Sequence, residues 1–202
     1  MENPVEEITG VITTLCTAES EVQQQAIDKY FTQDALFIHP FCRTLRVSNS
    51  TWMIKKIYAW YKILSPHIDI KVDSIAFDQA NMILYVTARQ TFRIQFIPLY
   101  KADVSLVTKL QLTHVRDAGL DPSYAGVVKQ TPGATASQAQ KYYIQSQNDL
   151  YQTNEFIKFV APWGVGSTIV ILWQIFATLM CVVGAMILWP LTWFRENLTN
   201  EA

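Results

Sequence analysis

One histidine stands where an ionisable side chain could do chemistry. His39 lies in the stretch DALFIHPF, residues 34–41, directly before Pro40. Because proline ends a strand or sits at its edge, we expect His39 at the end of a strand. An imidazole titrates near neutral pH, so it can act as a general base or contact a ligand. It can also simply bond a backbone carbonyl, and the sequence leaves these three roles open.

The sequence supplies no obvious chemical partner for this histidine. It shows no Ser-His-Asp order, no Gly-rich phosphate loop and no metal-ligand spacing. The cysteines, Cys16, Cys42 and Cys181, match neither a disulfide framework nor a metal site, which fits a reducing compartment. We therefore expect no metal and no cofactor.

Charge argues against nucleic acid as a partner. Basic and acidic residues balance over residues 1–158, so the electrostatic footprint of a nucleic-acid-binding protein is missing. One local asymmetry stands out, because residues 35–67 contain five basic side chains and no acidic one. This stretch is either a solvated helix face or a surface that faces anionic lipid headgroups.

The elements that must position His39 follow from the hydrophobic periodicity. Apolar residues at helical spacing predict helices over the first 31 residues, with a second helix at Ser20–Tyr30, and a third that Asn49 or Ser50 caps and that runs to about Leu64. From His67 onward the period is two, and four long strands follow, with a loop at residues 119–140. Helices followed by strands predict an α+β fold with helices on one face of a curved antiparallel sheet.

This order, together with the D-A-x-x-x-[DEH]-P pattern of DALFIHP, resembles the NTF2-like superfamily. That superfamily includes nuclear transport factor 2, SnoaL-like cyclases, ketosteroid isomerase and scytalone dehydratase. The phrases FRIQFIPLYKADVSLVTKLQL and NDLYQTNEFIKF resemble its fungal SigF-like branch, which carries a hydrophobic C-terminal segment. The resemblance covers about residues 5–160, and it implies a cone whose open end holds an apolar pocket.

The resemblance also bears on function. Ketosteroid isomerase carries its base, an aspartate, at the position of His39, but the positions of its oxyanion hole fall near Val11 and Thr113, which supply no comparable donors. Isomerase chemistry is therefore not implied. A resemblance to scytalone dehydratase would imply a pair of pocket histidines with tyrosines nearby, and His39 and His114, with Tyr58 or Tyr85, could make such a pair. The aromatic cluster at residues 52–61 either lines the cavity or belongs to the core. The candidate ligand-binding residues are His39, Tyr58, Tyr61, Tyr85 and His114.

An apolar tract is the strongest feature of the chain. Residues 159–194 form 36 consecutive positions without a charge, and residues 165–189 alone make a helix of roughly 38 Å. The hydrocarbon core of a bilayer is about 30 Å thick, so a helix of this length can cross it. Glycine and proline lie toward the ends of the tract, so one span is favoured over a hairpin. We expect a cone at residues 1–158, a membrane segment at 159–194 and a polar tail at 195–202.

Location and function follow as expectations. The N-terminus is acidic and lacks the features of a signal peptide. The sequence therefore predicts a tail-anchored, single-pass protein of the endoplasmic reticulum or another endomembrane, with its N-terminal domain in the cytosol. Its cone would bind an apolar small molecule or lipid, or present a surface to a protein partner. The alternative is an isomerase-, cyclase- or dehydratase-type enzyme with His39 as general base, and a homodimer is left open.

Overall fold

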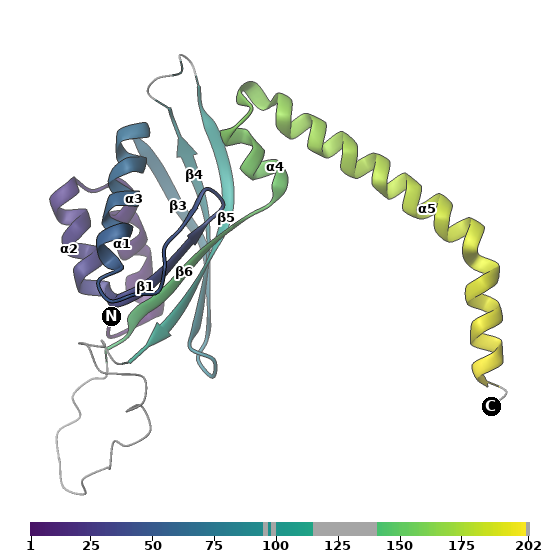
Figure 1. Cartoon of the computed structure of the whole chain (residues 1–202), viewed down its shortest axis with the longest axis horizontal. Coiled ribbons are helices and arrows are strands. Elements are labelled where there is room, and N and C mark those ends of the chain that lie inside the picture. The colour runs from purple at the N-terminus through teal and green to yellow at the C-terminus, as the bar shows by residue number, and fades with distance from the viewer. Residues whose placement is uncertain (95–96, 98–99, 115–140, 201–202) are drawn as a thin grey trace, which may run out of the picture.

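The computed structural model describes residues 1–94, 97, 100–114 and 141–200 (Figure 1). The loop predicted at residues 119–140 lies outside the described residues. The cone consists of α1 (Pro4–Thr17), α2 (Ser20–Tyr30), β1 (Phe31–His39), β2 (Cys42–Arg43), α3 (Thr51–Leu64), β3 (Ile68–Asp78), β4 (Ile83–Phe92), β5 (Ala102–Thr113) and β6 (Tyr143–Tyr151). The C-terminal part consists of α4 (Thr153–Phe156), the 3-10 turns η2 (Ile157–Phe159) and η3 (Pro162–Gly164), and α5 (Val165–Asn200).

The strands form one curved sheet in the order β2-β1-β6-β5-β4-β3, and α1, α2 and α3 cover one of its faces (Figure 1). The α+β prediction is confirmed. The sheet differs from the fully antiparallel expectation in one pairing, because β1 runs parallel to β6, with Phe37 opposite Gln147. The two-residue strand β2, which is too short to leave a periodic pattern, was also not predicted.

The core lies between the helices and the sheet. On α1, Ile8, Val11 and Leu15 recur at helical spacing and are buried. They pack in one cluster with Leu84 and Val86 of β4, which alternate with outward-facing residues as the period of a strand requires. The alternation on β4 therefore fixes which of its side chains face the helices.

The start of α3 differs from the predicted cap. Ser50 occupies the N-cap position, but its side chain makes no capping hydrogen bond to α3. The hydroxyl instead donates to the carbonyl oxygen of Ala35 at 2.6 Å, and Ser50 is fully buried. Asn49 before it has a φ of 65°. The prediction that this side chain caps α3 is therefore wrong. Its hydrogen bond to Ala35 instead connects the start of α3 to β1.

The C-terminal helix α5 is continuous from Val165 to Asn200, so the tract is not folded as a hairpin. Within it, the 24 residues from Val165 to Leu188 are long and apolar enough to cross a membrane. At about 1.5 Å per residue they span about 36 Å. Large apolar side chains along this stretch, such as Ile169, Trp173 and Met186, are exposed on all sides of the helix.

Candidate functional site

A cavity of about 560 Å³ lies between the helices and the concave side of the sheet. Its volume falls within the range of small-molecule sites, and most of its lining is apolar. Residues of α1, α2, α3 and all six strands contribute. Its lining includes Cys16, Gln23, Phe37, His39, Phe41, Lys56, Tyr58, Trp60, Tyr61, Lys62, Ala88, Gln90, Phe92, Thr108, Gln147, Asp149, Tyr151 and Phe159.

The inner part of the cavity carries a hydrogen-bonded group of four side chains, which we call the inner network: Tyr58, Thr108, Gln147 and Asp149. The Tyr58 hydroxyl donates to Gln147 Oε1 at 3.2 Å. Gln147 Nε2 donates to the two Asp149 oxygens at 3.0 and 3.2 Å, and Thr108 Oγ1 donates to Oδ1 at 2.8 Å. All four side chains are buried, so each bond is made away from water.

Asp149 is the ionisable member of the inner network. Burial raises the pKa of its carboxyl to about 6, and the hydrogen bonds from Gln147 and Thr108 oppose that rise. A carboxyl with this pKa can hold or release a proton near neutral pH. The sequence did not reveal Asp149 as a site residue, because the residues on both faces of this strand are polar, as the stretch QSQND shows. Polarity alone therefore does not indicate which face of the strand points inward.

His39 ends β1, as predicted, and lines the cavity. Its Nδ1 accepts a hydrogen bond from the Phe41 amide at 3.3 Å, so Nε2 carries the proton and can donate to a ligand. The rings of Tyr61 and Tyr151 have centroids 5.3 Å from that of His39. Burial lowers the pKa of His39 to about 4, so the ring is neutral at pH 7. Among the described residues, no carboxylate is hydrogen-bonded to His39.

The other predicted ligand-binding residues divide into two groups. Tyr58 and Tyr61 line the cavity beside His39. Tyr85 is not part of the lining, because on β4 it alternates with the inward-facing Leu84 and Val86. His114 follows β5 and has its ring 4.4 Å from that of Tyr142, so the structure does not bring His39 and His114 together.

Two further groups on the helices bear on what the cavity can bind. Gln23 donates through Nε2 to the Leu15 carbonyl at 2.7 Å, while its buried Oε1 has no hydrogen-bond partner within the described part of the chain. This oxygen is itself buried, so it does not open into the cavity. Burial raises the pKa of the Cys16 thiol to about 12, so Cys16 stays protonated at neutral pH. The described residues contain no cluster of three His, Cys, Asp or Glu side chains that could hold a metal ion.

Aromatic rings surround the outer end of the cavity. We call Phe41, Phe92, Tyr151, Phe156 and Phe159 the aromatic rim. The Phe159 ring lies at the centre of it, with centroid distances of 5.7 Å to Phe41, 5.6 Å to Phe92 and 5.8 Å to Tyr151. Phe41 is 51% exposed, so the cavity reaches the surface here. Phe159, predicted as the first residue of the membrane segment, thus packs within the cone.

A helix-covered curved sheet that encloses a largely apolar cavity is the architecture of an NTF2-like cone. The sequence matches the model of the family described as SigF NTF2-like domain over residues 1–120 and 135–193. The chain belongs to this family. The matched residues include α5 up to residue 193.

No curated protein matches the sequence. Among solved structures, a ketosteroid isomerase-like protein from Catenulispora acidiphila bound to trimethylamine is 14% identical, with a TM-score of 0.47 over 72% of this chain and 87% of that one. A SnoaL-like polyketide cyclase from Jannaschia sp. is 12% identical, with a TM-score of 0.47 over 77% and 93%. An LEH-like epoxide hydrolase from M. tuberculosis is 9% identical, with a TM-score of 0.46 over 84% and 98%. Nothing about the activity of this chain follows from these likenesses.

Proposed function

We propose that the protein is a membrane-attached binding module whose cone holds an apolar molecule carrying one or two polar groups. The observation that carries this proposal is the cavity of about 560 Å³, which is mostly apolar but has a few polar atoms in its lining. The Nε2–H of His39 is a donor, whereas the Asp149 carboxylate is an acceptor. A hydroxyl group, which donates and accepts, suits both kinds of partner.

The apolar helix supports the membrane part of this proposal. Val165–Leu188 has the length and composition of a spanning helix, and its apolar side chains are exposed among the residues that the structure describes. A ligand that dissolves in lipid would be at high concentration where such a helix resides. Attachment to an endomembrane with the cone in the cytosol stays a prediction, and the bilayer is the partner it requires.

Mass spectrometry of the purified protein tests the proposal. The full chain is used, because Phe159 lines the cavity and a shorter chain would open it. We expect a specific small molecule or lipid to co-purify with the protein in detergent. Ala88→Leu narrows the cavity, since Ala88 is buried in its lining, and should lose that molecule.

The matched control is Ala76→Leu on β3, where the alanine is exposed and lies outside the lining. This variant should retain the molecule. If nothing co-purifies with the wild type, or if both variants retain the molecule equally, the cone is not its binding site. The alternative role, presentation of a surface to a protein partner, would then be preferred.

A second candidate is an enzyme of the isomerase, cyclase or dehydratase type acting on a hydrophobic substrate. His39 was predicted as its general base, but the described residues give it no carboxylate partner. The observation that favours this candidate is instead Asp149, whose pKa near 6 suits proton transfer at neutral pH. Incubation with the co-purified molecule in heavy water tests it. Deuterium entering carbon positions of the molecule, and lost in Asp149→Asn, would indicate catalysis, while no exchange indicates binding alone.

A further inference from the structure

The mouth of the cavity lies at the end of the cone from which α5 departs. We define the mouth by Phe41 and Trp60, which line the cavity yet are 51% and 55% exposed, and by Phe159 between them and the helix. Here β1 and β6 end, β5 begins, and α3 reaches its last turn. Figure 1 shows α4 and the start of α5 beside the same end of β5.

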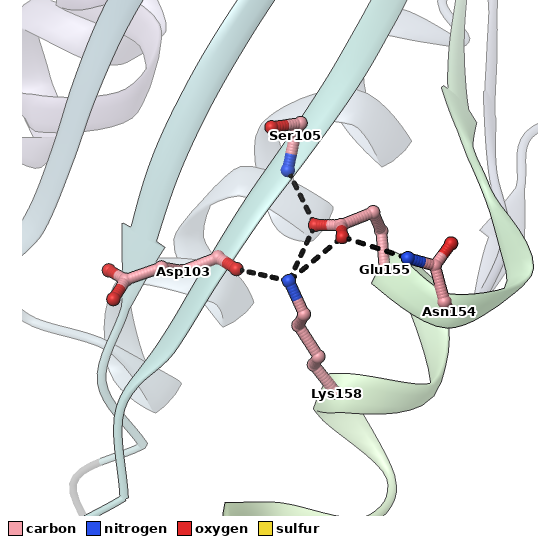
Figure 2. Close-up of polar contacts among 5 residues, drawn as sticks. All are labelled: Asp103, Ser105, Asn154, Glu155 and Lys158. Carbon is pink, nitrogen blue, oxygen red and sulfur yellow. Dashed lines mark hydrogen bonds and ion pairs between the residues drawn. The ribbon is translucent and has the colours of Figure 1, made fainter. Parts of the chain in front are cut away.

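Side chains attach the segment that leads to α5 to this end of the sheet (Figure 2). The Glu155 carboxylate accepts from the Ser105 backbone amide at 2.8 Å and from Lys158 Nζ at 2.8 and 2.9 Å. Lys158 Nζ also donates to the Asp103 carbonyl at 2.8 Å, and Asn154 donates to Glu155 at 3.2 Å. We call Glu155 and Lys158 with these β5 backbone groups the latch. It fixes the residues around Phe159 to the cone.

The path from the latch to the apolar helix is short. Five residues, 160–164, separate Phe159 from Val165, and even a fully extended chain of this length reaches only about 20 Å. The first turn of α5 also packs closely on this segment. A Cβ at Gly166 would lie 2.6 Å from the Cβ of Ala161 and 2.9 Å from Ile157. If α5 spans a bilayer, the mouth is therefore held close to the surface of that bilayer.

The surface around the mouth has the chemistry of a lipid contact. Apolar side chains are exposed there and on the segment that follows, including Val160 at 60% and Trp163 at 73%. The acidic residues at this end of the cone are ion-paired, namely Glu155 with Lys158, Asp103 with Lys101 and Asp69 with Arg93.

Three of the five cations of residues 35–67 remain without a carboxylate partner among the described residues: Arg43, Lys56 and Lys62. The other two pair with acidic residues, Arg46 with Asp34 and Lys55 with Asp28. Lys62 lines the cavity and donates through Nζ to the Thr17 carbonyl at 2.7 Å. Lys56 also lines it, with Nζ 6.0 Å from the centre of the Trp52 ring. Arg43 lies on β2, two residues after Phe41. Cations near an anionic membrane surface strengthen binding to it.

We propose that the mouth rests on the anionic surface of the bilayer that α5 enters, so that the cavity exchanges its ligand with the lipid phase instead of with water. The exposed rings of Phe41 and Trp60 enter the headgroup region, and Arg43 and Lys62 contact lipid phosphates. This inference rests on the proposed function, since it requires α5 to be in a membrane. It goes beyond the proposed function because it gives the mouth a role in membrane contact and ligand exchange.

Tryptophan quenching in vesicles tests the position of the mouth. The full chain is reconstituted in phosphatidylcholine and phosphatidylserine vesicles, with or without bromine on the phosphatidylcholine acyl chains near the headgroup. Trp60→Phe, Trp52→Phe and Trp173→Phe are compared with the wild type. Trp52 is the matched control, because it is 58% exposed on the same helix, eight residues before Trp60, and does not line the cavity.

The difference in fluorescence between the wild type and each variant gives the emission of the substituted tryptophan. We expect the Trp60 and Trp173 contributions to fall several-fold in brominated vesicles, and the Trp52 contribution to stay unchanged. Quenching of Trp173 without quenching of Trp60 would overturn the proposal while leaving α5 in the membrane. An unquenched Trp173 would instead overturn the membrane part of the proposed function. Equal quenching of Trp52 and Trp60 would place the side of α3 on the bilayer and also overturn the proposal.

Two further measurements distinguish contact with the bilayer from contact with a second copy of the chain, and test the role of lipid charge. If a second copy of the chain covered the mouth, Trp60 would be protected from iodide in water and yet unquenched by bromine, which would overturn the proposal. Vesicles of phosphatidylcholine alone test the charge. Quenching of Trp60 should weaken in them, and unchanged quenching would overturn the contact between the cations and anionic headgroups.

Discussion

The inner end of the cavity and its mouth differ in what stabilises them. At the inner end, Tyr58, Gln147 and Asp149 are buried and hydrogen-bonded to one another. At the mouth, the aromatic rim is partly exposed and the latch is made of charged side chains that are partly exposed. A change to a buried polar group leaves its partners unpaired, whereas water replaces a lost contact at the surface. The inner end should therefore control stability, and the mouth should control access.

The largest effect is expected for Gln147→Leu. The substitution removes the donor to Asp149 and the partner of the Tyr58 hydroxyl, both buried. Hydrogen bonds to charged groups and unpaired buried groups each contribute a few kcal/mol, so we expect a loss of about 3 to 4 kcal/mol in the free energy of unfolding. Denaturant titration in detergent measures it. Gln90→Leu, at a partly exposed lining position outside the inner network, should cost under about 1 kcal/mol, and equal losses would contradict the comparison.

The next effect is a pH dependence of opposite sign at two residues. The raised pKa of Asp149 gives stability that is present below about pH 4 and lost as the pH rises through about 6. The lowered pKa of His39 gives stability that is present above pH 6.5 and lost as the pH falls toward 4. In the wild type these contributions oppose each other.

Melting temperatures from pH 4 to 8 test this prediction. Asp149→Asn should become more stable relative to the wild type as the pH rises, by up to about 3 kcal/mol for a shift of about two pKa units. His39→Gln should show the reverse trend, with a relative loss of stability as the pH rises. Parallel pH profiles for the wild type and both variants would mean that neither group is perturbed by burial.

A smaller effect is expected for His39→Ala. The side chain makes one hydrogen bond, from the Phe41 amide at 3.3 Å, and is only half-buried, so we expect a stability loss of about 1 kcal/mol or less. The amount of co-purifying molecule should fall more clearly. A loss of several kcal/mol with the molecule retained would show that His39 supports the fold and does not contact the ligand.

The smallest effect on global stability is expected for Glu155→Ala in the latch. The change removes an ion pair and an acceptor for the Ser105 amide, and we expect a loss of under about 1 kcal/mol. Hydrogen exchange should nevertheless become faster at Ser105 and in α4. Asp69→Ala, at an exposed ion pair with an N–O distance of 3.7 Å, is the control and should leave this exchange unchanged. Unchanged exchange in Glu155→Ala would mean that the latch does not hold the segment.

Local periodicity explains how much of the fold the sequence predicted. The bounds of α2, Ser20–Tyr30, and the end of α3 at Leu64 match the prediction, because helical spacing is a property of neighbouring residues. The parallel pairing of β1 with β6 joins residues about a hundred positions apart, as Phe37 and Gln147 show. No local pattern encodes such a pairing.

The site was harder to predict than the fold. His39 and Tyr58 were identified because an ionisable residue before proline and an aromatic residue on an apolar helix face are visible locally. Asp149 was missed, because its inward direction depends on the register of β6 against β5, where it lies opposite Thr108. Tyr85 was assigned to the ligand site although the parity of β4 turns it away from the lining.

The latch has a consequence for solubility as well. Strand β6 ends opposite Leu106, so within the described part of the chain residues 102–105 of β5 pair with no strand on that side. Glu155 and Lys158 satisfy the Ser105 amide and the Asp103 carbonyl, which would otherwise offer free hydrogen-bonding groups to a strand from another molecule. Two charged side chains thus cover an open sheet edge and disfavour edge-to-edge aggregation.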